Sequence, residues 1–211
     1  MPIIDLTHPI EPDMPVYPGD EQPEIATTAT IDQDGHQARR LTLTTHLGTH
    51  LDAPAHLLPR GRTLDQFPAS HFQGPARVVD CRQVRGEITL AHLEPLASLR
   101  EADFILLLTG WDRHWRTAAY FTDFPVLSAQ AAEWLAQLPI KGLGLDAISI
   151  DLLGAAQLPN HRRFLGQDKV IIENLTRLDA IPGQVCQLYC LPLLITAADG
   201  APARVIAVVS A

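Results

Sequence analysis

Seventeen prolines in a chain of 211 residues restrict its fold more than any other feature of the sequence. Proline lacks a backbone N–H and clashes with the preceding helical turn, so it ends or kinks helices and is excluded from central strands. We therefore expect short strands and short helices. No internal repeat, charge block or linker divides the chain, and its length suits one core, so we predict a single domain over residues 1–211.

Short apolar or alternating segments predict the strands. The continuous apolar run 104–109 ends at Gly110 and is typical of a strand buried on both faces. Residues 25–31 and 40–45 alternate apolar and threonine side chains, the pattern of strands with one buried face. The other segments that read as strands are 3–6, 76–80, 142–150, 169–172, 187–191 and 204–209.

Two segments predict helices. Ser128 can cap a helix over residues 128–138, whose apolar side chains recur at helical spacing. Thr89 can cap a second helix over residues 89–99 in the same way. Many strands with only a few helices indicate a mixed α/β domain.

Composition excludes several classes of function. A formal charge of -8 argues against a nucleic-acid partner, because phosphate binding needs a clustered basic surface. No apolar run approaches the length of a membrane span, and the first residues lack the features of a secretory signal. Three cysteines, an odd number, suit reduced and buried thiols. We expect a cytoplasmic protein that binds neither nucleic acids nor membranes.

Three of the nine histidines fall within one segment, residues 46–56. His46, His50 and His56 share this segment with Asp52. Borderline divalent cations such as zinc and manganese prefer imidazole nitrogen and carboxylate oxygen as ligands. The residue types therefore predict a catalytic metal site.

Backbone geometry decides whether this segment can be a metal site. On a straight strand His46 and His50 would lie about 13 Å apart, too far to share an ion. On a helix Asp52 would face away from His50. Gly48, which has no Cβ, can take dihedral angles closed to other residues, so a bend there would bring the three side chains together. We therefore predict a bend at Gly48.

Isolated histidines are more often ordinary surface or core residues than ligands. His8, His36, His71, His92 and His114 have no metal-like spacing, and we expect them to be surface or structural residues. Three histidines, an aspartate, a glycine and a proline in the order found at residues 46–56 favour a metal site over a chance arrangement.

Other motifs do not support a competing function. Residues 142–147 satisfy the G-x-G-x-x-A pattern, but residues 148–150 continue as a strand where a dinucleotide site needs a helix. The sequence contains no G-x-S-x-G elbow of serine hydrolases and no G-x-x-x-x-G-K phosphate loop.

The segment 46–56, H-L-G-T-H-L-D-A-P-A-H, resembles the H-x-G-T-H-x-D-x-P-x-H signature of the cyclase-like metal-dependent hydrolases. That family includes bacterial kynurenine formamidase and isatin hydrolase. The resemblance continues at residues 5–10, 17–20, 109–111, 144–146, 149–151, 173–175 and 191–193. It implies a swivelling β/β/α fold and assembly into homodimers or homotetramers.

The resemblance also implies roles for particular residues. The metal ligands would be His46, His50, Asp52, His161 and Glu173, holding one or two divalent ions, with zinc as the first choice and manganese as the second. His56 would be the general acid and base. The residues alone support Glu173, which follows an apolar strand, whereas residues 160–163 read as an exposed loop. Only the resemblance singles out His161.

The implied reaction is hydrolysis of a small amide, such as the aryl formamide N-formylkynurenine. A metal-bound hydroxide would attack the carbonyl, while His56 accepts the water proton and returns it to the departing amine. Tyr17 stands where formamidases of this family carry tryptophan, and we expect it to bind the substrate. This difference leaves two alternatives open: a cyclic-amide hydrolase of the isatin type, and a non-catalytic metal-binding or ligand-binding protein.

Overall fold

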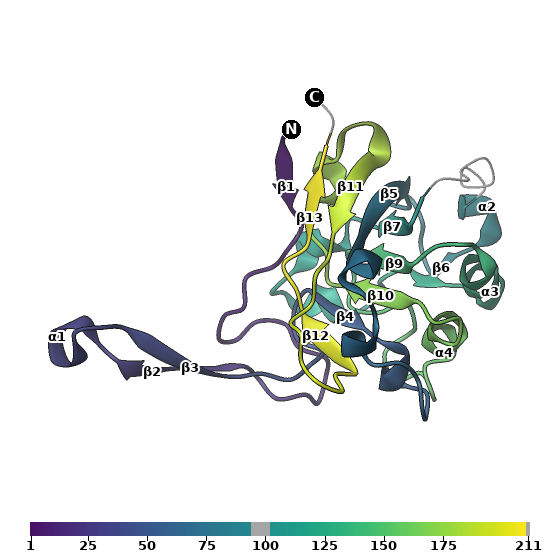
Figure 1. Cartoon of the computed structure of the whole chain (residues 1–211). Helices are drawn as coiled ribbons and strands as arrows, with labels where there is room; N and C mark the ends of the chain where they lie inside the picture. The colour runs from purple at the N-terminus through teal and green to yellow at the C-terminus, as the bar shows by residue number, and fades with distance from the viewer. Residues whose placement is uncertain (94–101, 210–211) are drawn as a thin grey trace.

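A nine-stranded mixed sheet organises the molecule in the computed structural model, which describes residues 1–93 and 102–209 (Figure 1). The strand order is β1-β13-β11-β5-β7-β9-β10-β4-β12. The bounds of these strands are β1 Ile3–Asp5, β4 His50–Asp52, β5 Gln73–Asp80, β7 Phe104–Leu108, β9 Gly142–Leu145, β10 Val170–Glu173, β11 Val185–Tyr189, β12 Gly200–Pro202 and β13 Ile206–Val208.

Shorter elements surround this sheet. The α-helices are α1 Ile31–Asp34, α2 Leu90–Leu93, α3 Ala129–Gln137 and α4 Pro159–Leu165. Two separate two-stranded sheets pair β2 Glu24–Ala29 with β3 Ala38–Thr42, and β6 Glu87–Ile88 with β8 Val126–Leu127. Single 3-10 turns cover Pro54–His56, Leu64–Gln66, Ala69–Phe72, Trp111–His114, Ala118–Phe121, Leu178–Ala180 and Pro182–Gln184.

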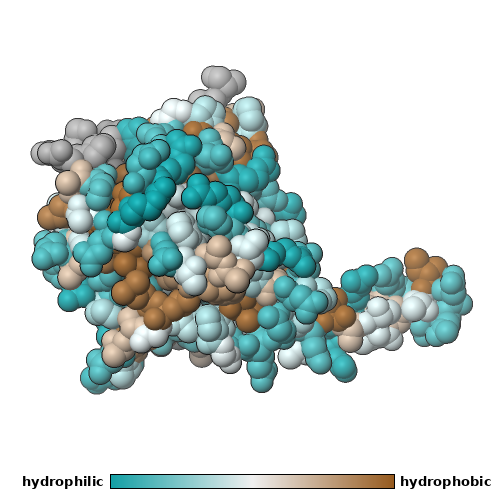
Figure 2. Space-filling view, turned by 180° about the vertical axis from the view of Figure 1, so that it is seen from behind, coloured by the Kyte–Doolittle hydropathy of each residue, from teal (hydrophilic) through white to brown (hydrophobic). Residues whose placement is uncertain are grey.

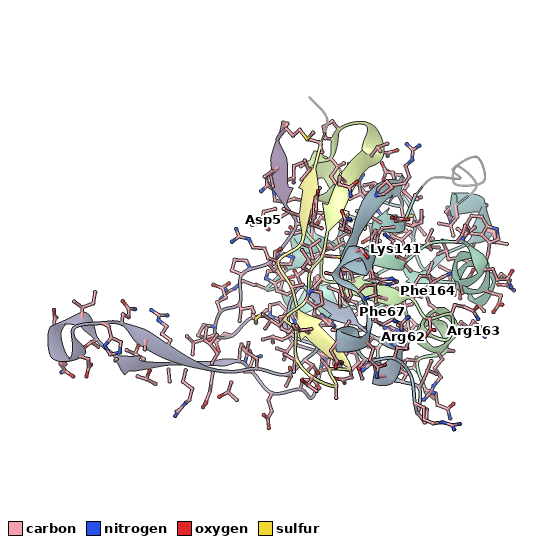
Figure 3. All side chains as sticks on the ribbon, in the orientation of Figure 1. Asp5, Arg62, Phe67, Lys141, Arg163 and Phe164 are labelled. Carbon is pink, nitrogen blue, oxygen red and sulfur yellow. The ribbon has the colours of Figure 1, made fainter. Side chains whose placement is uncertain are left out.

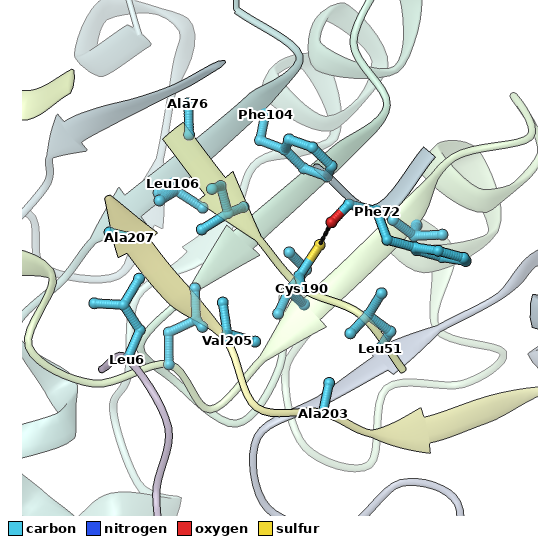
Figure 4. Close-up of a cluster of buried hydrophobic side chains, with 14 of the residues drawn as sticks. Leu6, Leu51, Phe72, Ala76, Phe104, Leu106, Cys190, Ala203, Val205 and Ala207 are labelled. Carbon is cyan, nitrogen blue, oxygen red and sulfur yellow. Dashed lines mark hydrogen bonds between the residues drawn. The ribbon is translucent and has the colours of Figure 1, made fainter. Parts of the chain in front are cut away.

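Strand β7 lies at the centre of the sheet and packs on both faces. It pairs in parallel with β5 and β9. Phe104 and Leu106 point into one apolar cluster, which Figure 4 shows, while Ile105 and Leu107 point into a second cluster under α3 and α4. The prediction of a strand buried on both faces is therefore confirmed.

Strand β4 carries part of the histidine segment and lies between two antiparallel neighbours. Its His50 is opposite Glu173 of β10 and Pro202 of β12. Its Asp52 is opposite Ile171 of β10 and Gly200 of β12. Sheet pairing therefore brings residues from the middle and the end of the chain to residues 50–52.

The predicted mixed α/β class is confirmed, and the helix capped by Ser128 forms as expected. The Ser128 hydroxyl oxygen accepts a hydrogen bond from the N–H of Ala131. Of the predicted helix 89–99, residues 90–93 form α2, and residues 94–99 lie outside the described residues. Cys81, Cys186 and Cys190 are free and buried, as the odd cysteine number suggested.

Three local predictions were wrong. The strand predicted over 142–150 ends at Leu145, because the carboxylate of Asp146 accepts hydrogen bonds from the backbone N–H groups of Thr109 and Gly110 at the end of β7. Residues 160–163, predicted as an exposed loop, lie within α4. Strands β2 and β3 form, but both have mostly exposed or half-buried side chains and neither has the buried face that their alternation predicted.

Within residues 1–93 and 102–209, no helix has both the length and the apolar character that crossing a membrane requires.

The central position of Leu106 leads to a stability prediction. Its side chain is fully buried in β7, so Leu106→Ala should lower the free energy of unfolding by about 2–5 kcal/mol. The matched control is Leu90→Ala, at a position that is 44% exposed, with an expected loss below about 0.5 kcal/mol. Urea unfolding of both variants measures the difference, and equal losses would contradict the packing described for β7.

Candidate metal centre

The histidine segment bends at Gly48, as predicted from the sequence. Gly48 has a φ of 59°, and a Cβ at this position would lie 2.7 Å from Cε of Met14. The Gly48 carbonyl accepts hydrogen bonds from Nδ1 of His50 and from the side-chain amide of Asn174, each at 2.8 Å. Thr49 in turn donates its hydroxyl to the carbonyl of Asn174 at 2.6 Å. The bend is therefore held by both a local and a distant contact.

The bend gathers His46, His50 and Asp52 around one point. Oδ1 of Asp52 lies 2.7 Å from Nδ1 of His46 and 3.2 Å from Nε2 of His50. The two imidazole rings are perpendicular, with centroids 5.2 Å apart. Nε2 of His50 is buried and has no hydrogen-bond partner among the described residues. An unpartnered buried nitrogen beside a carboxylate fits a cation ligand, because a buried polar atom without a partner is costly.

A second cluster, of Asp52, His161 and Glu173, adjoins the first. Nε2 of His161 lies 3.0 Å from Oε1 of Glu173 and 3.6 Å from Oδ2 of Asp52. All three side chains are buried. Asp52 therefore faces the first cluster with one oxygen and the second cluster with the other. Three ligand atoms in each cluster lie within 4.8 Å of one another, which suits one or two ions.

Residues 160–163 form part of α4, and not the predicted loop, for a clear physical reason. Pro159 occupies the first position of α4, where its missing N–H costs nothing. The carboxylate of Asp151 accepts hydrogen bonds from the next two backbone N–H groups, those of Asn160 and His161. A carboxylate eight residues before the helix thus caps it, and a local pattern does not reveal this.

Two further carboxylates orient imidazole rings by contacting the ring nitrogen that points away from Asp52. Nε2 of His46 lies 3.1 Å from Asp199, and Nδ1 of His161 lies 2.8 Å from Asp151. Because a carboxylate accepts, these contacts favour a proton on the nitrogen that faces it and leave the opposite nitrogen free for a cation. Sequence reasoning missed both carboxylates. Asp151 lies in the segment 149–151 that resembles the family, and this resemblance was the signal that could have singled it out. Asp199 reaches the site only because β12 pairs with β4.

The electrostatics of the two clusters favour positive charge. Burial opposes charging of His46, but Asp52 and Asp199 outweigh burial and raise its pKa to about 9. Burial is likewise outweighed at His161, where Asp151 and Glu173 raise the pKa to about 10. Where carboxylates hold extra protons on imidazoles, a divalent cation can bind in exchange for those protons.

His56 lies beside the clusters in the 3-10 turn Pro54–His56. Its ring centroid is 3.9 Å from that of His46, and its Nδ1 is 3.8 Å from Oδ2 of Asp199. Burial is the main reason why its pKa is lowered. The lowered pKa favours the neutral imidazole, and His56 lies next to the candidate ligands with Nδ1 towards Asp199.

The chain after His56 folds back and fixes this turn. Ala55 donates its N–H to the carbonyl of Arg62 at 3.0 Å. Gly61 passes so close to Pro54 that a Cβ would lie 2.5 Å from its carbonyl. The guanidinium of Arg62 lies 3.8 Å from the ring centroid of Phe67, a pair labelled in Figure 3. These contacts tie the turn Pro54–His56 to the chain that follows it.

A cavity of about 290 Å³ opens over the clusters. It is lined by Pro15, Val16, Tyr17, Asp20, His46, Gly48, His50, Asp52, His56, Ile148, Ser149, Leu158, His161 and Glu173. The Tyr17 hydroxyl accepts a hydrogen bond from the N–H of Gly154 at 3.3 Å, which joins the two loops over the cavity. The structure therefore brings all seven predicted site residues to one cavity, and their chemical roles remain predictions.

Comparison with known proteins matches residues 4–152 to the family model Cyclase, described as "Putative cyclase". The chain belongs to the cyclase family. A kynurenine formamidase from Salinibacter ruber is 32% identical to this chain, over 98% of this chain and 97% of its own length.

Two solved structures resemble this protein over nearly the whole chain. Isatin hydrolase A from Labrenzia aggregata, bound to benzyl benzoate, has a TM-score of 0.88 at 27% identity and covers 100% of this chain and 94% of its own. A predicted metal-dependent hydrolase from Bacillus stearothermophilus has a TM-score of 0.81 at 31% identity and covers 98% and 97% of the two chains. These similarities confirm the predicted cyclase-like fold and, with the buried clusters, indicate a metal-dependent hydrolase.

The contact between His161 and Asp151 predicts a change in metal affinity. Asp151→Asn removes the carboxylate charge that faces Nδ1 of His161 and should weaken metal binding about 10–100-fold. Asp123→Asn, an exposed change of the same kind, should leave affinity unchanged. Competition with a chromogenic chelator measures both, and unchanged affinity in Asp151→Asn would show that this carboxylate does not support a ligand.

Proposed function

We propose that this protein hydrolyses a small amide with one or two divalent cations held by its two clusters. One ion would be bound by His46, His50 and Asp52. A second would be bound by Asp52, His161 and Glu173. The observation that supports this proposal best is the buried carboxylate of Asp52, whose two oxygens face imidazoles of different clusters.

Zinc is the ion we propose first, with manganese as the alternative, because the candidate ligands are three imidazoles and two carboxylates without a thiolate. When bound, such a cation lowers the pKa of a coordinated water towards about 7 and polarises a carbonyl oxygen. A purely structural zinc site is usually closed by four ligands rich in cysteine, and this donor set is different.

His56 is the residue we propose for proton transfer. Its Nδ1 lies 3.8 Å from Oδ2 of Asp199, so the charge of that carboxylate would draw the imidazole proton to Nδ1 and leave Nε2 to accept one. Hydrolysis adds the water oxygen to the carbonyl carbon and breaks the C–N bond, giving a carboxylic acid and an amine. His56 would take the water proton at Nε2 and return it to the departing nitrogen.

The substrate we propose is an aryl formamide such as N-formylkynurenine. The formamidase name of the 32% identical relative supports this choice, and Tyr17 supplies an aromatic wall in a cavity of about 290 Å³. The likeness to isatin hydrolase A favours a second candidate, the opening of a cyclic amide. Both reactions use the same atoms around Asp52 and His56. A non-catalytic binding protein would have no use for His56 beside its ligands.

Metal analysis tests the proposed ligands. Purified protein should contain one or two equivalents of metal, and His50→Ala should lose at least one of them, because His50 contributes a buried nitrogen with no other partner. His36→Ala changes an exposed histidine far from the clusters and should keep the full metal content. Equal metal contents in the two variants would refute the ligand assignment.

A paired activity assay tests the proposed reaction. N-formylkynurenine and isatin should be compared at equal concentrations, and we expect faster turnover of the formamide. His56→Ala should lower kcat about 10²–10⁴-fold while its metal content stays at the level of the unmodified protein. If neither compound nor a related amide is hydrolysed by metal-loaded protein, the binding-protein alternative replaces this proposal.

A further inference from the structure

The turn at residues 17–20 brings a carboxylate to the rim of the cavity over the two clusters. The N–H of Asp20 donates to the carbonyl of Tyr17 at 2.9 Å, as in a type II turn with Pro18 and Gly19 at its centre. Gly19 has a φ of 103°, a left-handed conformation that favours glycine. Tyr17 and Asp20 both line the cavity, so one turn supplies an aromatic ring and a negative charge.

Contacts on both sides hold this turn in place. Met14, at the start of the loop, is 1% exposed and packs on the bend at Gly48, where its Cε would lie 2.7 Å from a Cβ. The Tyr17 hydroxyl accepts a hydrogen bond from the N–H of Gly154. Shortly after the turn, the chain enters β2 of the projecting hairpin (Figures 1 and 2). Asp20 therefore has a defined position at the cavity rim, although its side chain is exposed.

Asp20 is the lining carboxylate that remains for a substrate. The other two, Asp52 and Glu173, are buried and are the proposed metal ligands. Asp199 contacts two imidazoles of the site. The ion pairs that lysine and arginine form within the described part of the chain all involve other carboxylates. Among the described residues, the charge of Asp20 therefore has no cationic partner.

The described residues that line the cavity include no lysine and no arginine. Arg162 of α4 donates its guanidinium N–H groups to the backbone carbonyls of Gln157 and Leu57, each at 2.8 Å. A carboxylate on a substrate would therefore be repelled by Asp20 without a compensating side-chain cation. An ammonium group on a substrate would instead form an ion pair, and an aromatic ring nearby adds a cation–π attraction. Alkyl amines carry this positive charge at pH 7.

We propose that Asp20 binds an ammonium group of the substrate, so that the protein prefers aryl formamides whose side chain ends in an amine without a neighbouring carboxylate. This inference rests on the proposed amide hydrolysis and names the charge of its substrate. With the formamide carbonyl at the clusters and the aryl ring beside Tyr17, a short side chain leads to the rim at Asp20. N-formylkynurenine brings an ammonium group to that carboxylate, but also a carboxylate that Asp20 repels. The decarboxylated amine, N-formylkynuramine, should therefore be the better substrate.

Three formanilides that differ only in the charge of one side chain test this preference. Each carries an ortho-acyl group whose chain ends in an ammonium group, a methyl group or a carboxylate. With metal-loaded protein at low ionic strength, kcat/KM for the ammonium compound should exceed that for the methyl compound about two- to fivefold, the range of an exposed ion pair. The carboxylate compound should be the slowest. Salt at about 1 M should bring the three values together, because it screens exposed charges.

Substitutions at Asp20 test whether this residue causes the preference. Asp20→Asn should bring the ratio of kcat/KM between the ammonium and methyl compounds to about one, because the ion pair is lost. Asp20→Lys should reverse the order and favour the carboxylate compound, a gain that a merely damaged variant does not show. Asp13→Asn is the matched control, since Asp13 is exposed in the same loop but does not line the cavity, and it should keep the ratio of the unmodified protein.

The outcomes separate this inference from the proposed reaction. Equal kcat/KM for the three compounds, or an ammonium preference that survives in Asp20→Asn, would overturn the role of Asp20 and leave amide hydrolysis standing. A preference that Asp13→Asn abolishes as well would assign it to the general charge of the loop and also overturn that role. If metal-loaded protein hydrolyses none of the three compounds, the proposed hydrolysis fails, and this inference fails with it.

Discussion

The buried carboxylate of Asp52 is the constraint on which the site depends. It is 1% exposed, and a carboxylate at that depth is costly unless both oxygens are paired. One oxygen lies between His46 and His50, and the other faces His161. The bend at Gly48 and the register of β4 with β10 both serve to bring these partners to it. A divalent cation satisfies this arrangement better than protons alone, since several imidazoles converge on few carboxylate oxygens.

Local chemistry explains what could be predicted from the sequence. The bend at Gly48 followed from the spacing of the histidines and the missing Cβ, and β7 followed from its unbroken apolar run. Distant contacts explain what was missed. α4 is capped by Asp151, and Asp199 reaches His46 through the pairing of β12 with β4. His161 was singled out as a ligand by resemblance alone, and its position 3.6 Å from Oδ2 of Asp52 gives that choice a physical reason.

The hairpin of β2 and β3 shows a different limit of pattern reasoning. Alternating side chains in β2 and β3 predicted one buried face, yet most of those side chains are exposed or half-buried in the single chain. Alternation indicates that a strand can pack on one side, but it does not show whether another part of the chain covers that side.

Anomalous diffraction from crystals of the metal-loaded protein tests the role of Asp52 most directly. Data collected at the absorption edge of the bound metal should show a peak within about 2.0–2.2 Å of Nδ1 of His46, Nε2 of His50 and a carboxylate oxygen of Asp52. A second ion would give a peak between Asp52, His161 and Glu173. Stoichiometric metal whose anomalous peaks lie away from Asp52 would contradict the account.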